Sequence, residues 1–341
     1  MNKSVNGLPR AYHPPYRAVI AGHGSFAPAK IVTNEDLAEM VETSDEWITT
    51  RTGIKTRHIT TDSETTAFLA TEAAKIALEG AKLRPADIDI IIVATITPEM
   101  VFPSTASFVQ QALRAKKACV FDLAAACSGF VYSISIAQQF IESGRYENAL
   151  LIGAETLTKI TDWTDRASCI LFGDGAGAVV LKRSDDERKG VIYSILFSDG
   201  ERWKALNCQA YGSRYPVGKP LDEPKKIYME IHGREVYQQA VRRIVETVTE
   251  CLDHCRIGID DIAMVISHQM NARIIESAAK RLKLPEEKVF ININEYGNTS
   301  AASLPIAFDE CVRAGRVKQG DLIIFVAFGA GLTWGANIVE L

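Results

Sequence analysis

The stretch "CVFDLAAACSGFVYSISIAQQ", residues 119–139, joins an apolar strand-like run to an amphipathic helix-like run, with Cys127 at the joint. Apolar side chains recur on one face of the predicted helix, at Phe130, Ile134, Ala137 and Ile141. At a helix start, unpaired backbone N–H groups and the positive end of the helix dipole favour a thiolate. The position therefore predicts a nucleophilic cysteine with a lowered pKa; the alternative is a small residue that only packs between strand and helix.

The composition is that of an ordinary soluble globular protein, with 341 residues, 47% of them hydrophobic and 23% charged. This length predicts two domains or one large duplicated domain. A formal net charge of −4, with no long basic run, argues against nucleic acid as the main partner. No apolar run is long enough to span a membrane. Seven scattered cysteines, without disulfide-like spacing, favour a reducing cytoplasm.

Strand-like and helix-like runs alternate along both halves of the chain, which predicts α/β layers with helices on the faces of largely parallel sheets. In the first half they include "IDIIIVAT", and in the second "IAMVISH" and "VFININ". Residues 183–228 are charged and irregular, and we expect one or two strands with long loops there. Residues 1–16, "MNKSVNGLPRAYHPPY", lack the apolar core of a signal peptide and are expected to form a loose N-terminal arm.

The two halves resemble each other. The segment "IESGRYENALLIG", residues 141–153, aligns without gaps with "VRAGRVKQGDLII", residues 312–324, an offset of 171 residues. This offset carries Cys127 onto Asn298, in "EYGNTSAASLP", which also lies at a strand-to-helix joint. The pattern predicts a duplicated α/β unit whose two joints lie at the carboxyl ends of strands, where α/β proteins usually form their sites.

Three further features near these strand ends could take part in chemistry. His268 follows the strand-like run "AMVIS", although a single histidine is more often an ordinary polar group. Asn298 follows a glycine and could equally be a turn or helix-capping residue. The segment "FGAGLTWG", residues 328–335, could supply backbone N–H groups to an oxyanion, or could be a tight hairpin. It lacks the spacing of a dinucleotide-binding motif.

Five motifs in order resemble the β-ketoacyl-[acyl-carrier-protein] synthase III family: "TSDEWITTRTGI", "DLAAACSGF", "FGDGAGA", "HQMNARI" and "EYGNTSAASLP". The resemblance runs from about Arg17 to the end of the chain. It implies a thiolase fold, a five-layered αβαβα arrangement of two similar halves. We place the half with the nucleophilic cysteine at residues 17–185 and the half with the histidine and asparagine at residues 186–341. The resemblance also implies a homodimer.

The same resemblance implies an acyltransferase that starts type II fatty acid synthesis. Such an enzyme condenses a short acyl-CoA primer, acetyl-CoA being favoured, with malonyl-acyl carrier protein (ACP), and requires no cofactor or metal. Cys127 would carry the acyl group, and His268 and Asn298 would complete a Cys-His-Asn triad. The backbone N–H groups of Cys127 and Ala330 would form the oxyanion hole. Relatives have glycine at position 330, but a backbone donor tolerates alanine.

The resemblance also implies three binding regions, whose residues are given with each. For CoA these are Trp47, Arg51, Arg166 and Asn271. For the acyl pocket they are Phe102, which would act across the dimer interface, and Phe328. For acidic carrier protein they are Arg273, Lys280 and Arg281. Without the family, "DEWITTR" would be interpreted as a helix with a capping box from Thr43 to Glu46, and the basic residues as a solvated helix face.

Some positions differ from the family pattern, and several alternatives stay open. Arg234, Gln238 and Met270 replace familiar residues near the pantetheine channel, so the primer is not fixed by the sequence. A related synthase of secondary metabolism or biotin-precursor synthesis would use the same triad with another primer. A cysteine-dependent thioesterase would use the same cysteine and histidine, and a non-catalytic acyl-binding subunit is a further alternative. A zinc site at Cys251, His254 and Cys255 lacks a second ligand pair.

Overall fold

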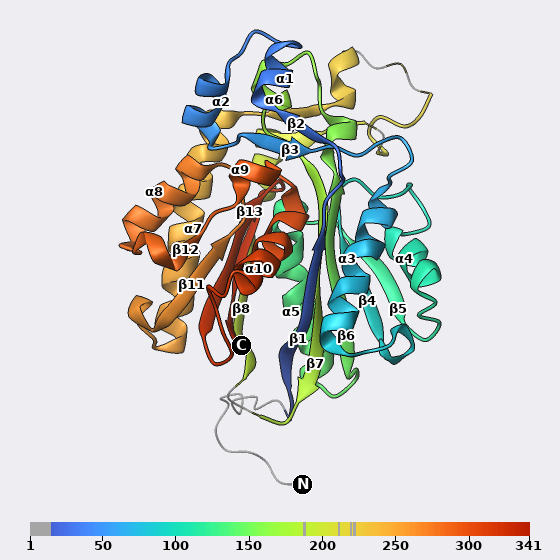
Figure 1. Ribbon diagram of the computed structural model, residues 1–341, viewed down its shortest axis with the longest axis vertical. Coiled ribbons are helices and arrows are strands. Elements are labelled where there is room, and N and C mark those ends of the chain that lie inside the picture. The colour runs from blue at the N-terminus through green and yellow to red at the C-terminus, as the bar shows by residue number, and fades with distance from the viewer. Residues whose placement is uncertain (1–14, 187–188, 211, 219, 221–222) are drawn as a thin grey trace.

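Two five-stranded sheets with the same strand arrangement form the body of the chain in a computed structural model (Figure 1), which describes residues 15–186, 189–210, 212–218, 220 and 223–341. Most of the expected N-terminal arm, residues 1–14, lies outside the described residues. In spatial order the first sheet contains β1 (Arg17–Phe26), β7 (Asp174–Ser184), β6 (Asn148–Thr156), β4 (Ile90–Ala94) and β5 (Cys119–Leu123). In matching order the second contains β8 (Gly190–Ser198), β14 (Thr333–Glu340), β13 (Leu322–Gly329), β11 (Ile262–Ser267) and β12 (Val289–Phe290).

The pairing directions match strand by strand. In the first sheet, β6, β4 and β5 are parallel, and β7 and β1 run antiparallel to their neighbours. In the second sheet, β13, β11 and β12 are parallel, and β14 and β8 pair antiparallel. The expected duplication is therefore confirmed at the level of topology. The chain crosses between the sheets after Ser184 and before Gly190, and a division into units at residues 185 and 186 stays a prediction.

Helices cover the sheets in three further layers (Figure 1). The outer face of the first sheet packs on α3 (Thr66–Ala81) and α4 (Thr105–Leu113). The outer face of the second packs on α7 (Gly233–Cys255) and α8 (Ala272–Leu282). Between the sheets lie α5 (Gly129–Glu142) and α10 (Ser303–Arg313). The order αβαβα is the five-layered thiolase fold that the sequence predicted.

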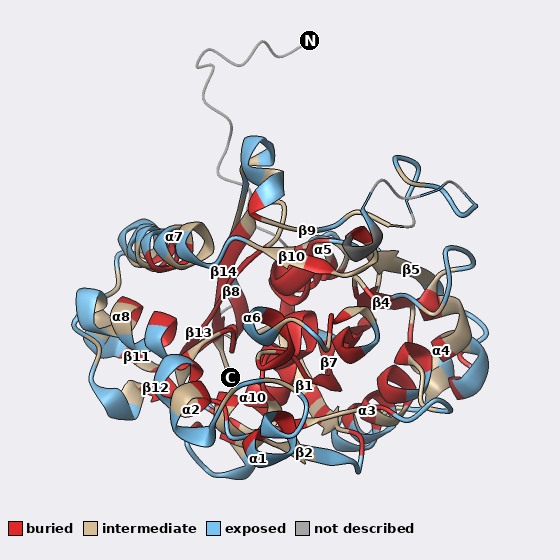
Figure 2. Ribbon diagram, turned by 90° about the horizontal axis from the view of Figure 1, so that it is seen from above, coloured by how far each residue is buried: buried red, intermediate tan, exposed pale blue. Residues whose placement is uncertain are grey.

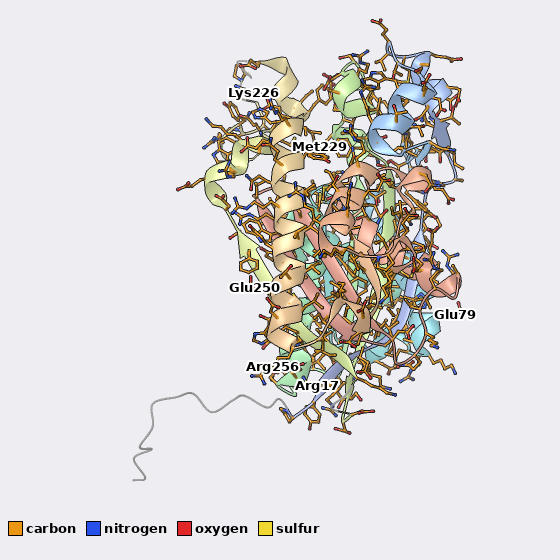
Figure 3. All side chains as sticks on the ribbon, turned by 90° about the vertical axis from the view of Figure 1, so that its left-hand side faces the viewer. Arg17, Glu79, Lys226, Met229, Glu250 and Arg256 are labelled. Atoms are coloured by element: carbon orange, nitrogen blue, oxygen red, sulfur yellow. The ribbon has the colours of Figure 1, made fainter. Side chains whose placement is uncertain are left out.

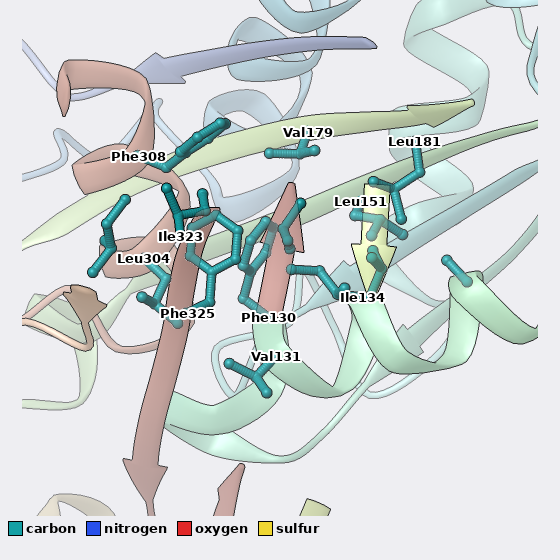
Figure 4. Packing of buried hydrophobic residues seen from close by; sticks show 14 of the residues in the cluster. Phe130, Val131, Ile134, Leu151, Val179, Leu181, Leu304, Phe308, Ile323 and Phe325 are labelled. Atoms are coloured by element: carbon teal, nitrogen blue, oxygen red, sulfur yellow. The ribbon is translucent and has the colours of Figure 1, made fainter. Parts of the chain in front are cut away.

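The central helical layer is the most deeply buried part of the chain (Figure 2). Phe130 of α5 and Phe308 of α10 both pack edge-on against Phe325 of β13, with ring centroids 6.3 Å and 5.3 Å away (Figure 4). The predicted apolar face of α5 is buried at all four positions. Burying a large apolar side chain contributes about 1.5–3 kcal/mol, so this layer holds the two halves together.

Short elements form a cap over one end of the layers, at the top of Figure 1. They include β2 (Ile31–Thr33), α1 (Asn34–Ala38), α2 (Asp45–Thr52), β3 (Thr56–His58), α6 (Arg166–Cys169), β9 (Leu206–Cys208), β10 (Met229–Ile231) and α9 (Ile293–Tyr296). The side-chain view places Met229 at this capped end, where α7 begins, and Arg256 at the other end, just past the last residue of α7 (Figure 3).

Two tight elbows precede the central helices. The 3-10 turn η2 (Ala126–Ser128) leads into α5, and η8 (Ser300–Ala302) leads into α10. Each turn begins with a non-glycine residue in the left-handed region, Ala126 at φ +46° and Ser300 at φ +47°. Such a conformation costs of order 1–3 kcal/mol and persists only where the surroundings fix it.

The elbows correct the sequence alignment. The last residues of α5 and α10, Glu142 and Arg313, keep the offset of 171 residues. Because α5 has 14 residues and α10 has 11, the elbows before these helices are instead 174 residues apart. The counterpart of Cys127 is therefore Ala301, and the expected match to Asn298 is wrong by three residues. Each elbow also packs on a glycine of the opposite half. A Cβ atom on Gly329 would lie 2.8 Å from Cys127 N, and one on Gly153 would lie 2.1 Å from Ala301 O.

Candidate active site

A pocket of about 400 Å³ opens where the two elbows meet, and it contains all three residues of the predicted triad. Cys127 comes from η2, His268 follows β11, and Asn298 precedes η8. Most of the remaining lining is apolar: Ile96, Leu157, Ile160, Leu171, Phe172, Leu206, Met229, Ile231, Val236, Met270, Ile274 and Phe328 among others. A few polar groups, the triad among them, therefore converge in a mostly apolar cavity, which is the usual composition of a small-molecule site.

Cys127 is only 7% exposed, and its environment differs from the expectation. Burial raises the pKa of the Cys127 thiol to about 12, and the charge of Glu155 also raises it, while the hydroxyl of Ser300 lowers it. The predicted lowering of the thiol pKa by the helix terminus is therefore wrong, because desolvation of the thiolate outweighs it. The thiol is neutral at physiological pH and needs a proton acceptor to become a nucleophile.

His268 has no exposed surface, and one ring nitrogen is fixed. Its Nδ1 lies 2.5 Å from Ser303 Oγ, at the start of α10, and Ser303 Oγ also accepts a hydrogen bond from Gln269 N at 3.2 Å. Its Nε2 is buried without a partner among the described residues. Burial lowers the pKa of His268 to about 3, so the imidazole is neutral at physiological pH.

Asn298 is held by both its backbone and its side chain. Its N–H donates to Leu171 O at 2.8 Å, and its carbonyl accepts from Gly173 N at 3.1 Å. The side-chain Oδ1 accepts from Ser300 N at 2.9 Å. With Oδ1 engaged in this way, the amide Nδ2 is the group left to donate to a ligand in the pocket.

The hairpin between β13 and β14 lies against the cysteine elbow. Thr333 Oγ1 donates to Ala125 O at 3.0 Å and to Ala330 O at 2.9 Å, and Ser128 Oγ donates to Thr333 O at 2.9 Å. Ala330 lines the pocket beside Cys127. The segment 328–335 is thus both a tight hairpin and a wall of the pocket, and Ala330 and Cys127 line the same cavity.

Trp47, Arg51 and Arg166 form one cluster at the capped end of the molecule. The Arg51 guanidinium lies 4.2 Å from the centre of the Trp47 ring, and the Arg166 guanidinium lies 4.7 Å from it. Asn271 connects this cluster to the pocket, because it lines the pocket and its Nδ2 donates to Arg51 O at 3.0 Å. An indole with two guanidinium groups suits a purine that carries anionic phosphates.

The helix that carries Trp47 begins one residue later than predicted. Ser44, not Thr43, is the N-cap of α2, and its hydroxyl accepts from Trp47 N at 3.2 Å. The expected capping box from Thr43 to Glu46 is therefore wrong. The extended backbone of Ser44, at φ −150°, directs its side chain to the first turn.

Of the other expected binding residues, some line the pocket and some are exposed at the surface. Phe328 and Met270 line the pocket, whereas Phe102 is 82% exposed and does not line it within this chain. Arg234 and Gln238 are exposed near the start of α7, next to lining residues of that helix.

The proposed carrier-protein residues lie together on one helix. Arg273, Lys280 and Arg281 are all exposed on α8. Asn271 is the N-cap of the same helix, so α8 runs from the pocket wall to the surface. The helix has a buried apolar face and an exposed basic one.

Sequence reasoning missed Ser300, Ser303 and Glu155. Ser300 lines the pocket, Ser303 holds His268, and Glu155 is a fully buried carboxyl on β6. A signal was present for Glu155, because a glutamate interrupts the apolar run "ALLIGAETL", and a buried acidic residue is rare without a specific partner. No comparable signal marks the two serines.

The described residues contain neither a metal-binding cluster nor a helix that could span a membrane. No group of three or more His, Cys, Asp or Glu side chains among them is arranged to hold a metal ion; His254 stacks on Tyr193 with ring centroids 4.0 Å apart. Of the described helices, none combines the length and the apolar character needed to cross a membrane.

The two matching halves, with a shared pocket between their elbows, define a condensing enzyme of the thiolase fold. A family model described as 3-Oxoacyl-[acyl-carrier-protein (ACP)] synthase III matches residues 121–200, and its C-terminal counterpart matches residues 252–341. A Beta-ketoacyl-[acyl-carrier-protein] synthase III from Caldanaerobacter subterraneus subsp. tengcongensis is 53% identical, over 95% of this chain and 97% of its own. The chain therefore belongs to the β-ketoacyl-[acyl-carrier-protein] synthase III family, which confirms the resemblance seen in the sequence.

Solved structures agree with this assignment. The crystal structure of 3-oxoacyl-[acyl-carrier-protein] synthase III from Aquifex aeolicus has a TM-score of 0.89 and 46% sequence identity, and the match covers 95% of this chain and all of that one. A priming β-ketosynthase from the R1128 polyketide biosynthetic pathway has a TM-score of 0.89 and 33% identity, over 98% and 99% of the two chains. The fold is therefore shared with enzymes named for different pathways.

Proposed function

We propose that this enzyme transfers a short acyl group, with acetyl favoured, from CoA to Cys127 and condenses it with malonyl-ACP. The products are CoA, carbon dioxide and a 3-oxoacyl-ACP, the starting unit of type II fatty acid synthesis. The observation that supports this most directly is the convergence of Cys127, His268 and Asn298 in one apolar pocket. The names of the curated relatives agree with it.

In the first half-reaction, the Cys127 thiolate attacks the thioester carbon of the acyl-CoA. The carbonyl oxygen becomes an oxyanion, and the backbone N–H groups of Cys127 and Ala330 stabilise it. The C–S bond to CoA then breaks, and the acyl group remains on Cys127 as a thioester. The apolar lining, including Phe328, excludes water that would otherwise hydrolyse this intermediate.

In the second half-reaction, His268 and Asn298 bind the thioester carbonyl of malonyl-ACP. In this step the ring proton of the neutral imidazole is on Nε2, which donates to the substrate, and the Ser303 hydroxyl then donates to His268 Nδ1. Asn298 Nδ2 is the second donor. When the malonyl carboxylate leaves as carbon dioxide, its electron pair forms an enolate whose oxygen these two donors stabilise. The enolate carbon attacks the acyl-Cys127 carbonyl, and the thiolate leaves.

Substrate binding uses the cluster at the pocket mouth and the basic face of α8. Trp47 stacks on the adenine of CoA, Arg51 and Arg166 bind its phosphates, and Asn271 contacts the pantetheine arm. Carrier proteins are acidic, so the exposed basic residues of α8, namely Arg273, Lys280 and Arg281, would attract one to the entrance. Both halves of the reaction then use the same channel to Cys127.

A homodimer completes the acyl pocket in this proposal. Strand β5 is an edge strand of its sheet, so its outer backbone groups can pair with a second copy. The apolar side chains of Met100, Val101 and Phe102 are 47%, 83% and 82% exposed in the single chain. An exposed apolar group of this kind marks an interface, and Phe102 would enter the partner's pocket and favour short primers.

The proposed reaction requires no resident cofactor. It exchanges no electrons with a redox partner, and loss of carbon dioxide drives the formation of the carbon–carbon bond. All seven cysteines are free, which supports a reducing cytoplasmic location.

The test is to incubate the purified enzyme with a panel of acyl-CoA primers, and then with malonyl-ACP. Acylation of the Cys127 peptide, measured by mass, followed by formation of 3-oxoacyl-ACP, is the expected result, with acetyl-CoA preferred. Preference for a longer or branched primer would assign the enzyme to a related pathway. Hydrolysis of the acyl-CoA without a condensation product would contradict the proposal and indicate a thioesterase.

A further inference from the structure

Glu155 is a fully buried carboxyl group that the proposed reaction does not yet use. Its Oε2 accepts hydrogen bonds from Thr95 Oγ1 at 3.1 Å, Ile96 N at 3.1 Å, Thr97 N at 3.1 Å and Thr97 Oγ1 at 2.6 Å. Its Oε1 accepts a single, longer bond, from Ile96 N at 3.2 Å. The carboxyl group is thus rigidly positioned, and Oε1 retains a free site for a proton.

Ser300 lies between this carboxyl and the cysteine. It is 2% exposed and lines the pocket with Cys127, and its hydroxyl has no hydrogen-bond partner among the described residues. The elbow that carries it packs on β6, the strand of Glu155, at Gly153. Gly153 and Glu155 project from the same face of β6, because successive side chains of a strand alternate. The Ser300 hydroxyl also lowers the pKa of both Cys127 and Glu155.

Because Cys127 is buried, its thiol needs a proton acceptor before it can act as a nucleophile. With its pKa raised to about 12, the Cys127 thiol does not ionise alone at physiological pH. His268 is neutral and serves as an N–H donor in the proposed reaction. Burial raises the pKa of Glu155 to about 7, so above that pH the carboxylate is ionised and can accept a proton, although the higher pKa of the thiol makes the transfer uphill until the thiolate attacks.

We propose that Glu155 receives the proton of the Cys127 thiol through the hydroxyl of Ser300. The thiol proton moves to Ser300 Oγ while the hydroxyl proton of Ser300 moves to Glu155 Oε1. This leaves a thiolate, an intact serine and a carboxylic acid. After acyl transfer, the same proton returns through Ser300 to the CoA thiolate that leaves, so charge and protons balance over the half-reaction.

The surroundings of Glu155 contain few other titratable groups. Cys127 on η2 is the one whose charge interacts with it, and the segment after β4 contributes only the hydroxyls of Thr95 and Thr97. His268, across the pocket, has its pKa set by burial alone. Burial is therefore the main influence on the pKa of Glu155, and the hydrogen bonds around the carboxyl group oppose it.

Asp174 on the adjacent strand β7 provides a matched control. It is equally buried and accepts hydrogen bonds from Thr60 N at 2.8 Å and Thr158 N at 2.9 Å, as well as from both threonine hydroxyls. It does not line the pocket and does not interact with Ser300 or Cys127. Asp174→Asn therefore removes a comparable buried carboxylate without touching the proposed route.

The test measures how fast iodoacetamide alkylates Cys127 between pH 5.5 and 9.5, by peptide mass, in the wild type and in Glu155→Gln, Ser300→Ala and Asp174→Asn. Free N-acetylcysteine, alkylated in the same buffers, serves as the reference thiol. General-base assistance contributes roughly 10²–10⁴ in rate, so we expect Glu155→Gln and Ser300→Ala to alkylate Cys127 at least about tenfold more slowly near pH 8. Both should also lose the rise in rate near pH 7, whereas Asp174→Asn should keep it.

Three results would overturn the inference. These are unchanged alkylation of Cys127 in Glu155→Gln, slowing in Glu155→Gln without slowing in Ser300→Ala, or an equal slowing at every pH. If Glu155→Gln fails to fold, Ser300→Ala still decides, because it keeps the carboxylate and removes only the bridge. The inference rests on the proposed nucleophile, but alkylation requires neither acyl-CoA nor carrier protein. Failure of the condensation assay and failure of this one are therefore distinguishable.

Discussion

His268 Nδ1 and Ser303 Oγ are 2.5 Å apart, although 35 residues separate them in the chain. Ser303 is the first residue of α10, and its oxygen also accepts the backbone N–H of Gln269. One hydroxyl thus joins the helix between the sheets to the strand end that carries the histidine. The orientation of His268 depends on this contact, because its other ring nitrogen has no partner among the described residues.

Ser303→Ala should slow condensation more than acyl transfer to Cys127. Without the hydroxyl, the imidazole loses the bond that fixes its ring and tautomer, and we expect about a tenfold loss, equivalent to about 1.4 kcal/mol. Single-turnover assays of each half-reaction measure the two rates. Ser133→Ala, which removes a buried serine hydroxyl within α5, is the control and should affect neither rate. Equal rates in Ser303→Ala and the wild type would contradict the role.

Asn298 can be tested by two substitutions that differ in one property. Asn298→Ala removes both polar atoms of the side chain, whereas Asn298→Asp keeps an oxygen for Ser300 N but has no N–H to donate. Loss of one oxyanion donor typically costs about 10²–10³ in rate, so both variants should lose condensation to that extent and keep acyl transfer. Release of labelled carbon dioxide from malonyl-ACP measures the first step. Normal decarboxylation by Asn298→Asp would show that Nδ2 is not a donor.

Local patterns in the sequence predicted the fold and much of the site. The apolar face of α5 and the strand ends before Cys127 and His268 follow from periodicity, and short alignments between the halves revealed the duplication. The wrong match of Cys127 to Asn298 has a simple cause, because α10 is three residues shorter than α5 and no gap-free alignment shows this.

Long-range contacts account for the remaining differences. The run "VFININ" was expected to be a strand, but β12 stops at Phe290. Gln269 Nε2 donates to Phe290 O at 3.1 Å, and Gln269 Oε1 accepts from Asn292 N at 3.1 Å, so a side chain replaces the partner strand. The raised pKa of Cys127 likewise depends on burial by segments that are distant in the chain. Neither effect has a local sequence signal.

Trp47→Ala should weaken binding of acyl-CoA without changing condensation of an enzyme that is already acylated. Trp47 has two guanidinium groups over its ring, and we expect the KM for acyl-CoA to rise about tenfold because adenine stacking is lost. Trp203→Ala is a close control, since Trp203 also has two cations over its ring, at 4.7 Å and 5.7 Å, but lies outside the pocket. A similar rise in both variants would indicate a general effect and contradict the assignment.

Gly329→Ala should damage both stability and acyl transfer. An added Cβ would lie 2.8 Å from Cys127 N, 3.0 Å from Cys127 Cβ and 3.1 Å from Ser128 N, so the elbow or β13 must shift. Overpacking of this kind costs about 1–3 kcal/mol, which denaturant unfolding measures. Cys127 N is also a proposed oxyanion donor, so the rate of acyl-enzyme formation should fall as well. Gly200→Ala, whose Cβ would have no neighbour within 4 Å, should change neither quantity. A stable Gly329→Ala enzyme with full acyl transfer would show that the close contact between the elbow and β13 does not position the thiol.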